Sequence, residues 1–142
     1  MGIYLKPFGY FLLSIIFCVC PMMLVGQTAQ QKSTQIQQKN RLTFSQGMNQ
    51  SAQELKWSHT YYQSFKKTQT ASYLKLAATH CANAIKLLET TQAMFPNTTR
   101  FYYKAKNKRF AVCQFYGKLQ ETALRLAPEY HIEDIANHSC KF

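Results

Sequence analysis

Apolar residues recur with helical spacing along the second half of the chain. Between Gly47 and Pro96 the sequence contains no glycine and no proline, which favours helix over loop. A single apolar stripe alternates between spacings of four and three residues here, and only Gln92 interrupts it; its members are Leu74, Ala78, Cys81, Ile85, Leu88 and Phe95. The pattern predicts a helix over residues 70–95. Pro96 should end it, because the proline ring cannot continue the helical hydrogen-bond ladder.

A second apolar stripe follows this proline with the same spacing. It predicts a helix over residues 98–127, with Asn97 or Thr98 as the N-cap and Pro128 as the stop. Its members are Phe101, Ala105, Val112, Phe115, Leu119, Ala123 and Leu126. Because the connection between the two stripes is short, the two helices should lie antiparallel as a long hairpin. The remaining tail has room for one short helix around residues 132–136.

The stretch before this hairpin predicts one more helix, over residues 51–67. Ser51 and Glu54 have the spacing of a capping box, in which the serine hydroxyl accepts a hydrogen bond from the amide three residues on. The apolar face and the aromatic residues beside it are Leu55, Trp57, Tyr61, Tyr62 and Phe65. The segment KKTQT should end this helix, and Thr68 or Thr70 should cap the next one, although no glycine or proline enforces the break.

These elements predict an all-α protein in which the first helix packs against the antiparallel hairpin, as in a three-helix bundle. A helical-repeat fold is the alternative. The segment AIKLLETTQAMFPN resembles the second helix of a tetratricopeptide repeat, with the alanine, the bulky pair and the closing proline in the family positions. ETALRLAPE is similar to the end of the same helix, and the closing prolines Pro96 and Pro128 are 32 residues apart, near the family period of about 34. The resemblance implies two degenerate repeats.

The N-terminal segment has the layout of a secretory signal peptide. One lysine precedes an apolar run over residues 8–25, and small and polar residues follow it. We expect a signal over residues 1–26, cleaved after Gly26 or Ala29, then a disordered glutamine-rich arm over residues 27–44 and one helical domain over residues 45–142. The protein would then be periplasmic or secreted. The alternative is a membrane anchor over residues 8–25, because the run approaches the roughly 20 residues that span a bilayer.

The chain is strongly basic. It carries 17 lysine and arginine residues against 6 acidic residues, for a formal net charge of +11. Such a balance favours an anionic partner, for example an acidic polymer of the cell envelope or nucleic acid; an anionic membrane surface becomes a partner if the N-terminal segment is retained. Two alternatives stay open: the partner is another protein, or the charge serves only solubility.

The run RFYYKAKNKRF concentrates this charge beside aromatic rings. Three of its cations are spaced four residues apart and so share one face of the predicted helix, and two further cations flank them. The candidate ligand-binding residues are Arg100, Tyr102, Tyr103, Lys104, Lys106, Lys108 and Arg109. Cations and aromatic rings together suit an anionic polymer, through charge and stacking. The alternative is an ordinary solvated helix face.

Two cysteines flank the predicted turn at Pro96. Cys81 and Cys113 lie at nearly equal distances from it, so closure of the hairpin brings them to a similar height. An oxidising compartment favours disulfides, and we expect a Cys81–Cys113 bridge, with pairing to Cys140 as the alternative. The bridge requires α-carbons within about 7 Å, which is tight for helix axes roughly 8–10 Å apart.

The sequence contains no phosphate loop, haem attachment or nucleophile elbow. His80 precedes Cys81, but neighbours on a helix point about 100° apart and cannot form a thiol–imidazole pair. The cysteines and histidines also lack the paired spacing of zinc sites. We therefore expect no catalytic residue, metal or cofactor, and a small exported basic helical module that binds or scaffolds. The alternatives are a membrane-tethered subunit of an envelope complex and a cysteine-dependent enzyme.

Overall fold

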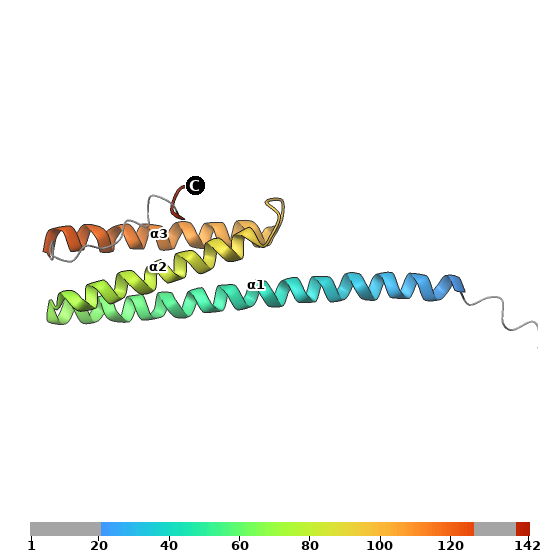
Figure 1. The fold of residues 1–142 in the computed structure, drawn as a ribbon, viewed down its shortest axis with the longest axis horizontal. Coiled ribbons are helices and arrows are strands. Elements are labelled where there is room, and N and C mark those ends of the chain that lie inside the picture. Colours follow the sequence, from blue (N-terminus) through green and yellow to red (C-terminus); the bar gives the residue numbers. More distant parts are fainter. Residues whose placement is uncertain (1–20, 127–138) are drawn as a thin grey trace, which may run out of the picture. The chain divides into compact units, whose positions relative to one another are not determined.

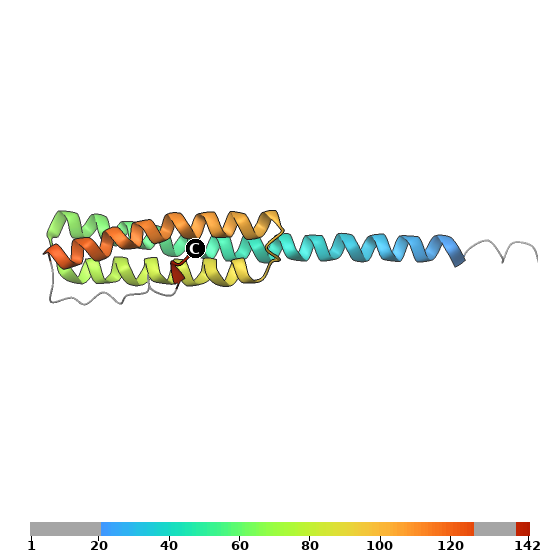
Figure 2. The ribbon, with the colours of Figure 1, turned by 90° about the horizontal axis from the view of Figure 1, so that it is seen from above.

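The computed structural model describes residues 21–126 and 139–142, and this part of the chain consists of three helices without a strand. They are α1 (Pro21–Thr68), α2 (Ala71–Ala93) and α3 (Arg100–Leu126). The chain divides into two compact units, residues 1–40 and 41–142, and the boundary falls inside α1. In the second unit, α2 runs back along the C-terminal part of α1 and α3 runs back along α2, in both views (Figures 1 and 2). The predicted all-α, three-helix bundle-like fold is confirmed.

Helix α1 is much longer than the predicted segment 51–67. The polar stretch over residues 27–44, which we expected to be a disordered arm, lies within α1, and every residue from 29 to 40 is exposed. Its glutamines and lysines favour helix, and no glycine or proline lies between Gly26 and Gly47. Most of the predicted signal over residues 1–26 and of the alternative anchor over residues 8–25 lies outside the described residues, as does the short helix predicted around residues 132–136. No described helix is long and apolar enough to cross a membrane.

The predicted capping box at Ser51 is wrong, because Ser51 lies in the interior of α1. Its side chain is buried, and its hydroxyl donates a hydrogen bond to the carbonyl oxygen of Met48 at 2.8 Å. An N-cap needs a non-helical backbone before it, and the residues before Ser51 continue the helix. Glu54 is thereby free to reach α2 instead of its own helix terminus.

The break between α1 and α2 falls where it was predicted, in KKTQT, and it depends on Gln69. This residue has φ of 54°, and its amide donates to the carbonyl oxygen of Phe65 at 2.7 Å, which closes the last turn of α1. A left-handed residue at this position ends a helix, although glycine usually occupies it. Thr70 is the N-cap residue of α2, but its hydroxyl makes no capping hydrogen bond.

The turn between α2 and α3 contains Pro96, as predicted, but the cap lies later than expected. Thr99, rather than Asn97 or Thr98, accepts a hydrogen bond at its hydroxyl from the amide of Tyr102 at 3.3 Å. The same hydroxyl donates to the carbonyl oxygen of Pro96 at 2.8 Å. This local network fixes the start of α3, from which the basic run extends.

The core lies along α2. Every member of its predicted apolar stripe is buried, and Gln92, the gap in that stripe, is buried as well. In α3 the predicted stripe is mostly buried or half-buried, but Leu126 is exposed. A smaller aromatic cluster closes the other end of the core, where Phe44 of α1 lies 5.7 Å from Phe95 and 4.7 Å from Phe101, measured between ring centroids.

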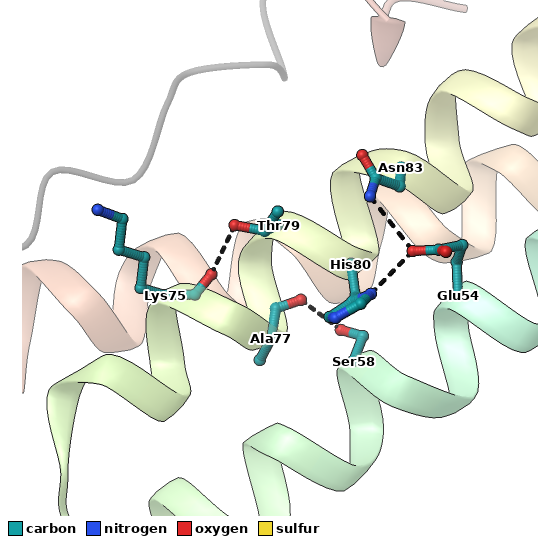
Figure 3. A network of polar contacts seen from close by, with 7 residues as sticks. All are labelled: Glu54, Ser58, Lys75, Ala77, Thr79, His80 and Asn83. Atoms are coloured by element: carbon teal, nitrogen blue, oxygen red, sulfur yellow. Dashed lines mark hydrogen bonds and ion pairs between the residues drawn. The ribbon is translucent and has the colours of Figure 1, made fainter.

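A polar cluster also joins α1 to α2 (Figure 3). The Ser58 hydroxyl donates to the carbonyl oxygen of Ala77 at 2.6 Å. One carboxylate oxygen of Glu54 lies 2.8 Å from Nδ1 of His80 and accepts a hydrogen bond from the side-chain amide of Asn83 at 3.3 Å. Because the serine bond is buried and directional, this cluster fixes the register of α1 against α2.

The alternative of two tetratricopeptide-like repeats does not describe this structure. A repeat ending at Pro96 would need a turn before Ala84, between its first and second helices. Instead α2 continues without interruption from Ala71 to Ala93. Its buried stripe keeps the same face across that position, so the segment is one helix of a bundle.

Candidate anion-binding face

Three cations of the basic run lie together on the exposed side of α3. Arg100, Lys104 and Lys108 are all exposed and follow one another at intervals of four residues, which turns the helix by only about 40° each time. None of the three has an ion-pair partner within residues 29–126 and 139–142. We call these three residues the basic face.

The carboxylates of the described residues are otherwise engaged or distant from this face. Glu54 pairs with His80 and Glu89 pairs with Arg109. The remaining one, Glu121, is exposed near the C-terminal end of α3 and has no ion pair among the described residues. The positive charge of the basic face is therefore not neutralised within the described structure.

Lys106 and Arg109, which were expected to flank the three cations as further ligand-binding residues, do not lie on the basic face. Lys106 is two residues from Lys104, which places it about 200° around the helix, and it is half-buried. Arg109 is only 8% exposed, and its guanidinium lies 3.3 Å from a carboxylate oxygen of Glu89 on α2. It also lies 4.9 Å from the centroid of the Phe142 ring. Arg109 thus stabilises the fold and is not available to a ligand.

The two tyrosines of the run also have different roles. Tyr102 is half-buried and packs against the aromatic cluster around Phe44 and Phe95. Tyr103 is 53% exposed and meets the Tyr102 ring edge to face at a centroid distance of 5.4 Å. Only Tyr103 can therefore offer a ring to a ligand beside the basic face.

An open groove of about 470 Å³ borders the basic face and connects it to α1. Lys108 lines it from α3, and the other lining residues come from α1: Ala52, Leu55, Lys56, His59, Thr60 and Gln63. Lys56 is exposed and, like Lys108, has no ion pair among the described residues. Lys56 was not among the binding residues predicted from the sequence. Its exposed position on α1 was readable from the helical period, but its closeness to Lys108 depends on how α1 packs against α3.

The predicted Cys81–Cys113 disulfide is wrong, and the alternative of pairing to Cys140 is confirmed: Cys113 is bonded to Cys140, with their α-carbons 5.8 Å apart. Cys81 lies in the middle of the α2 stripe, fully buried, and its thiol is 3.7 Å from the carbonyl oxygen of Val112. Cys113 is one residue past Val112, so it is rotated about 100° away from that contact, towards the C-terminal residues. Equal height along the hairpin was therefore insufficient, because Cys81 on α2 faces the backbone of Val112, whereas the Cys113 side chain points to another side of α3.

Among the described residues, neither Cys81 nor Cys113 forms a nucleophilic pair with a histidine. Burial raises the pKa of the Cys81 thiol from 9.0 to about 12, although a hydrogen bond with Ser58 opposes this shift. His80, its neighbour, turns away and stacks on Tyr61 at 5.3 Å while its Nδ1 faces Glu54. Cys113 has no free thiol. A thiolate is the reactive form of cysteine, and neither sulfur provides one at neutral pH.

The C-terminal residues are held over the same side of α2 and α3 as Arg109. The Ser139 hydroxyl donates to a carboxylate oxygen of Glu89 at 2.9 Å, and the Phe142 ring meets Phe110 at 5.2 Å. Together with the disulfide, these contacts place Glu89, Arg109 and Phe142 in one structural cluster. No feature of the sequence indicated this cluster, because its members are far apart along the chain.

Within the described ranges no group of three or more histidine, cysteine, aspartate or glutamate side chains is arranged to hold a metal ion. Two further histidines, His131 and His138, lie outside those ranges. No protein-family model matches the chain, and no curated protein or solved structure is significantly similar to it.

Proposed function

We propose that the protein is a small exported helical module that binds an anionic polymer through the basic face. The observation that carries this proposal is the grouping of Arg100, Lys104 and Lys108, exposed and without a carboxylate partner among the described residues. A polymer with repeating anionic groups suits these three cations better than a single small ion does, because successive anionic groups can pair with the cations on successive turns of the helix.

The position of these cations along α3 supports the same proposal. Arg100 is the first residue of the helix, and the first turn contains no acidic residue. The helix macrodipole places partial positive charge at that end, so Arg100 in the first turn costs roughly 0.3–1 kcal/mol. Folding alone gains nothing from this arrangement, whereas a bound anion would be attracted both by the side chains and by the helix terminus.

The proposed location follows from the sequence. An apolar run preceded by a lysine favours export, and acidic or phosphate-rich polymers are abundant at the surface of cells. The disulfide between Cys113 and Cys140 suits the oxidising compartment that an exported protein enters. We therefore propose a polymer of the cell envelope as the partner, with the basic face as the contact.

Charge reversal tests this function. The triple variant Arg100→Glu, Lys104→Glu and Lys108→Glu should elute from phosphocellulose at a lower salt concentration and bind soluble polyphosphate roughly 100-fold more weakly, at about 1 kcal/mol for each cation lost. All three positions are exposed on a helix that glutamate tolerates, so circular dichroism should show an unchanged fold.

The matched control reverses Lys67, Lys75 and Lys86 to glutamate. These residues are also exposed on helices, and their reversal changes the net charge by the same amount away from the basic face. Retention close to that of the unmodified protein would locate binding on the basic face. Equal weakening of both triple variants would show that only net charge matters, and the proposal would be rejected.

A further inference from the structure

The groove beside the basic face combines positive charge with an apolar floor. It occupies about 470 Å³, within the range of roughly 300–1,000 Å³ that is usual for small-molecule sites. Its lining residues span about three turns of α1, from Ala52 to Gln63, or roughly 16 Å along the helix axis. An inorganic anion would fill only a small part of this length.

The cations of the groove come from two different helices. Lys56 belongs to α1 and Lys108 to α3, and both residues are exposed and lack an ion pair among the described residues. Two such groups can approach one anionic head from opposite sides. A phosphate or carboxylate would then receive charge-assisted hydrogen bonds from both lysines.

The floor of the groove is apolar. Leu55 is half-buried and packs against the core, and Ala52 is exposed one turn before it. The methylene stems of Lys56 and Lys108 add to this apolar surface. The His59 ring packs against Phe115 at a centroid distance of 4.3 Å and so closes the side towards α3. A hydrophilic polymer would leave this floor without a complementary contact.

We propose that this groove binds one anionic amphiphile, with its phosphate or carboxylate head between Lys56 and Lys108 and its apolar chain along Leu55 and Ala52. This inference rests on the proposed function, because it assigns a ligand class to the edge of the same anion-binding face. The anionic head supplies the ion-pair partner that the two lysines lack among the described residues, and the chain removes the apolar floor from water.

Decyl phosphate below its micellar concentration is the probe, and backbone amide shifts of the full chain provide a reading for each residue. Shifts should saturate at residues 52–63 and 108. The double variant Lys56→Gln and Lys108→Gln should bind at least about tenfold more weakly at these residues, the effect of losing one charge-assisted hydrogen bond. Decyl maltoside has the same chain with a neutral head. It should bind to the unmodified protein as weakly as decyl phosphate binds to the double variant.

Two further variants separate the parts of the site. Ala52→Gln keeps both lysines and extends a polar chain into the groove. It should therefore weaken the binding of decyl phosphate and leave the binding of polyphosphate unchanged. Lys67→Gln with Lys86→Gln removes two exposed lysines elsewhere and should change neither. Inorganic phosphate should bind more weakly than decyl phosphate, because it cannot use the apolar floor.

Equal binding of decyl phosphate and decyl maltoside, or an unchanged affinity in the Lys56 and Lys108 double variant, would overturn the amphiphile site. If polyphosphate binding still depended on Arg100, Lys104 and Lys108, the proposed function would stand without it. If charge reversal at Arg100, Lys104 and Lys108 left polyphosphate binding unchanged while decyl phosphate still bound saturably, the polymer proposal would be rejected instead.

Discussion

Gly47→Ala should destabilise the protein by roughly 2 kcal/mol, the difference between an overpacking cost of about 3 kcal/mol and a gain in helix propensity of about 1 kcal/mol. A Cβ atom on Gly47 would lie 2.1 Å from Oγ1 of Thr91 and 3.1 Å from its Cβ and Cγ2. Thr91 is buried on α2, and its hydroxyl donates to the carbonyl oxygen of Leu87 at 2.7 Å. The side chain therefore cannot move aside, and the two helices must separate.

The other glycine inside a described helix of the bundle provides the control. A Cβ on Gly117 of α3 would meet nothing within 4 Å, so Gly117→Ala should stabilise the protein by about 0.5–1 kcal/mol through helix propensity alone. Urea denaturation followed by circular dichroism measures both changes. Adding Thr91→Ala to Gly47→Ala should recover part of the loss, because it removes two of the three close atoms. A stabilising Gly47→Ala would mean that α1 and α2 do not approach at this position.

Cys140→Ser should destabilise the protein by about 3 kcal/mol, because the bond that it removes closes a loop between residues 27 positions apart. The unfolded chain gains conformational freedom when the loop opens. Reduction of the unmodified protein should produce the same loss, and Cys113→Ser should match it. A lower urea midpoint in all three cases, relative to the oxidised protein, is the expected result.

Peptide mapping without reductant tests the pairing itself. It should recover Cys113 linked to Cys140, and Cys81 as a free thiol that a maleimide labels only after unfolding. Native labelling should fail, since burial keeps the Cys81 thiol out of solvent and raises its pKa to about 12. Recovery of a peptide that links Cys81 to Cys113 would contradict the structure and restore the pairing expected from the sequence.

The elements that the sequence predicted well are those with strong local signals. The apolar stripe of α2 and Pro96 placed the second helix within two residues at each end, and the same reasoning placed α3. The start of α1 was missed because its glutamine-rich part has no apolar period, although glutamine and lysine are good helix formers. Ser51 then mimicked a helix start, since a capping box is a local pattern that an interior serine can match by chance.

Only those features of the candidate site that depend on a single helix could be predicted from the sequence. The period of α3 was enough to group Arg100, Lys104 and Lys108. The burial of Arg109 was not, because it depends on Glu89 from another helix and on Phe142 from the C-terminus. The disulfide prediction failed for the same reason: Cys140 reaches Cys113 through the packing of the C-terminal residues on the hairpin, which height along the hairpin does not reveal.

The salt dependence of polyphosphate binding tests the basic face most directly. Each contact between a cation and a phosphate contributes a slope of roughly 0.7 to a plot of log affinity against log salt concentration for a single-stranded polyanion. Neutral substitution of Arg100, Lys104 and Lys108 by glutamine should therefore reduce the slope by about 2. The same substitutions at Lys67, Lys75 and Lys86 should leave it unchanged. A slope that falls equally in both variants, or in neither, would contradict the basic face as the site of binding.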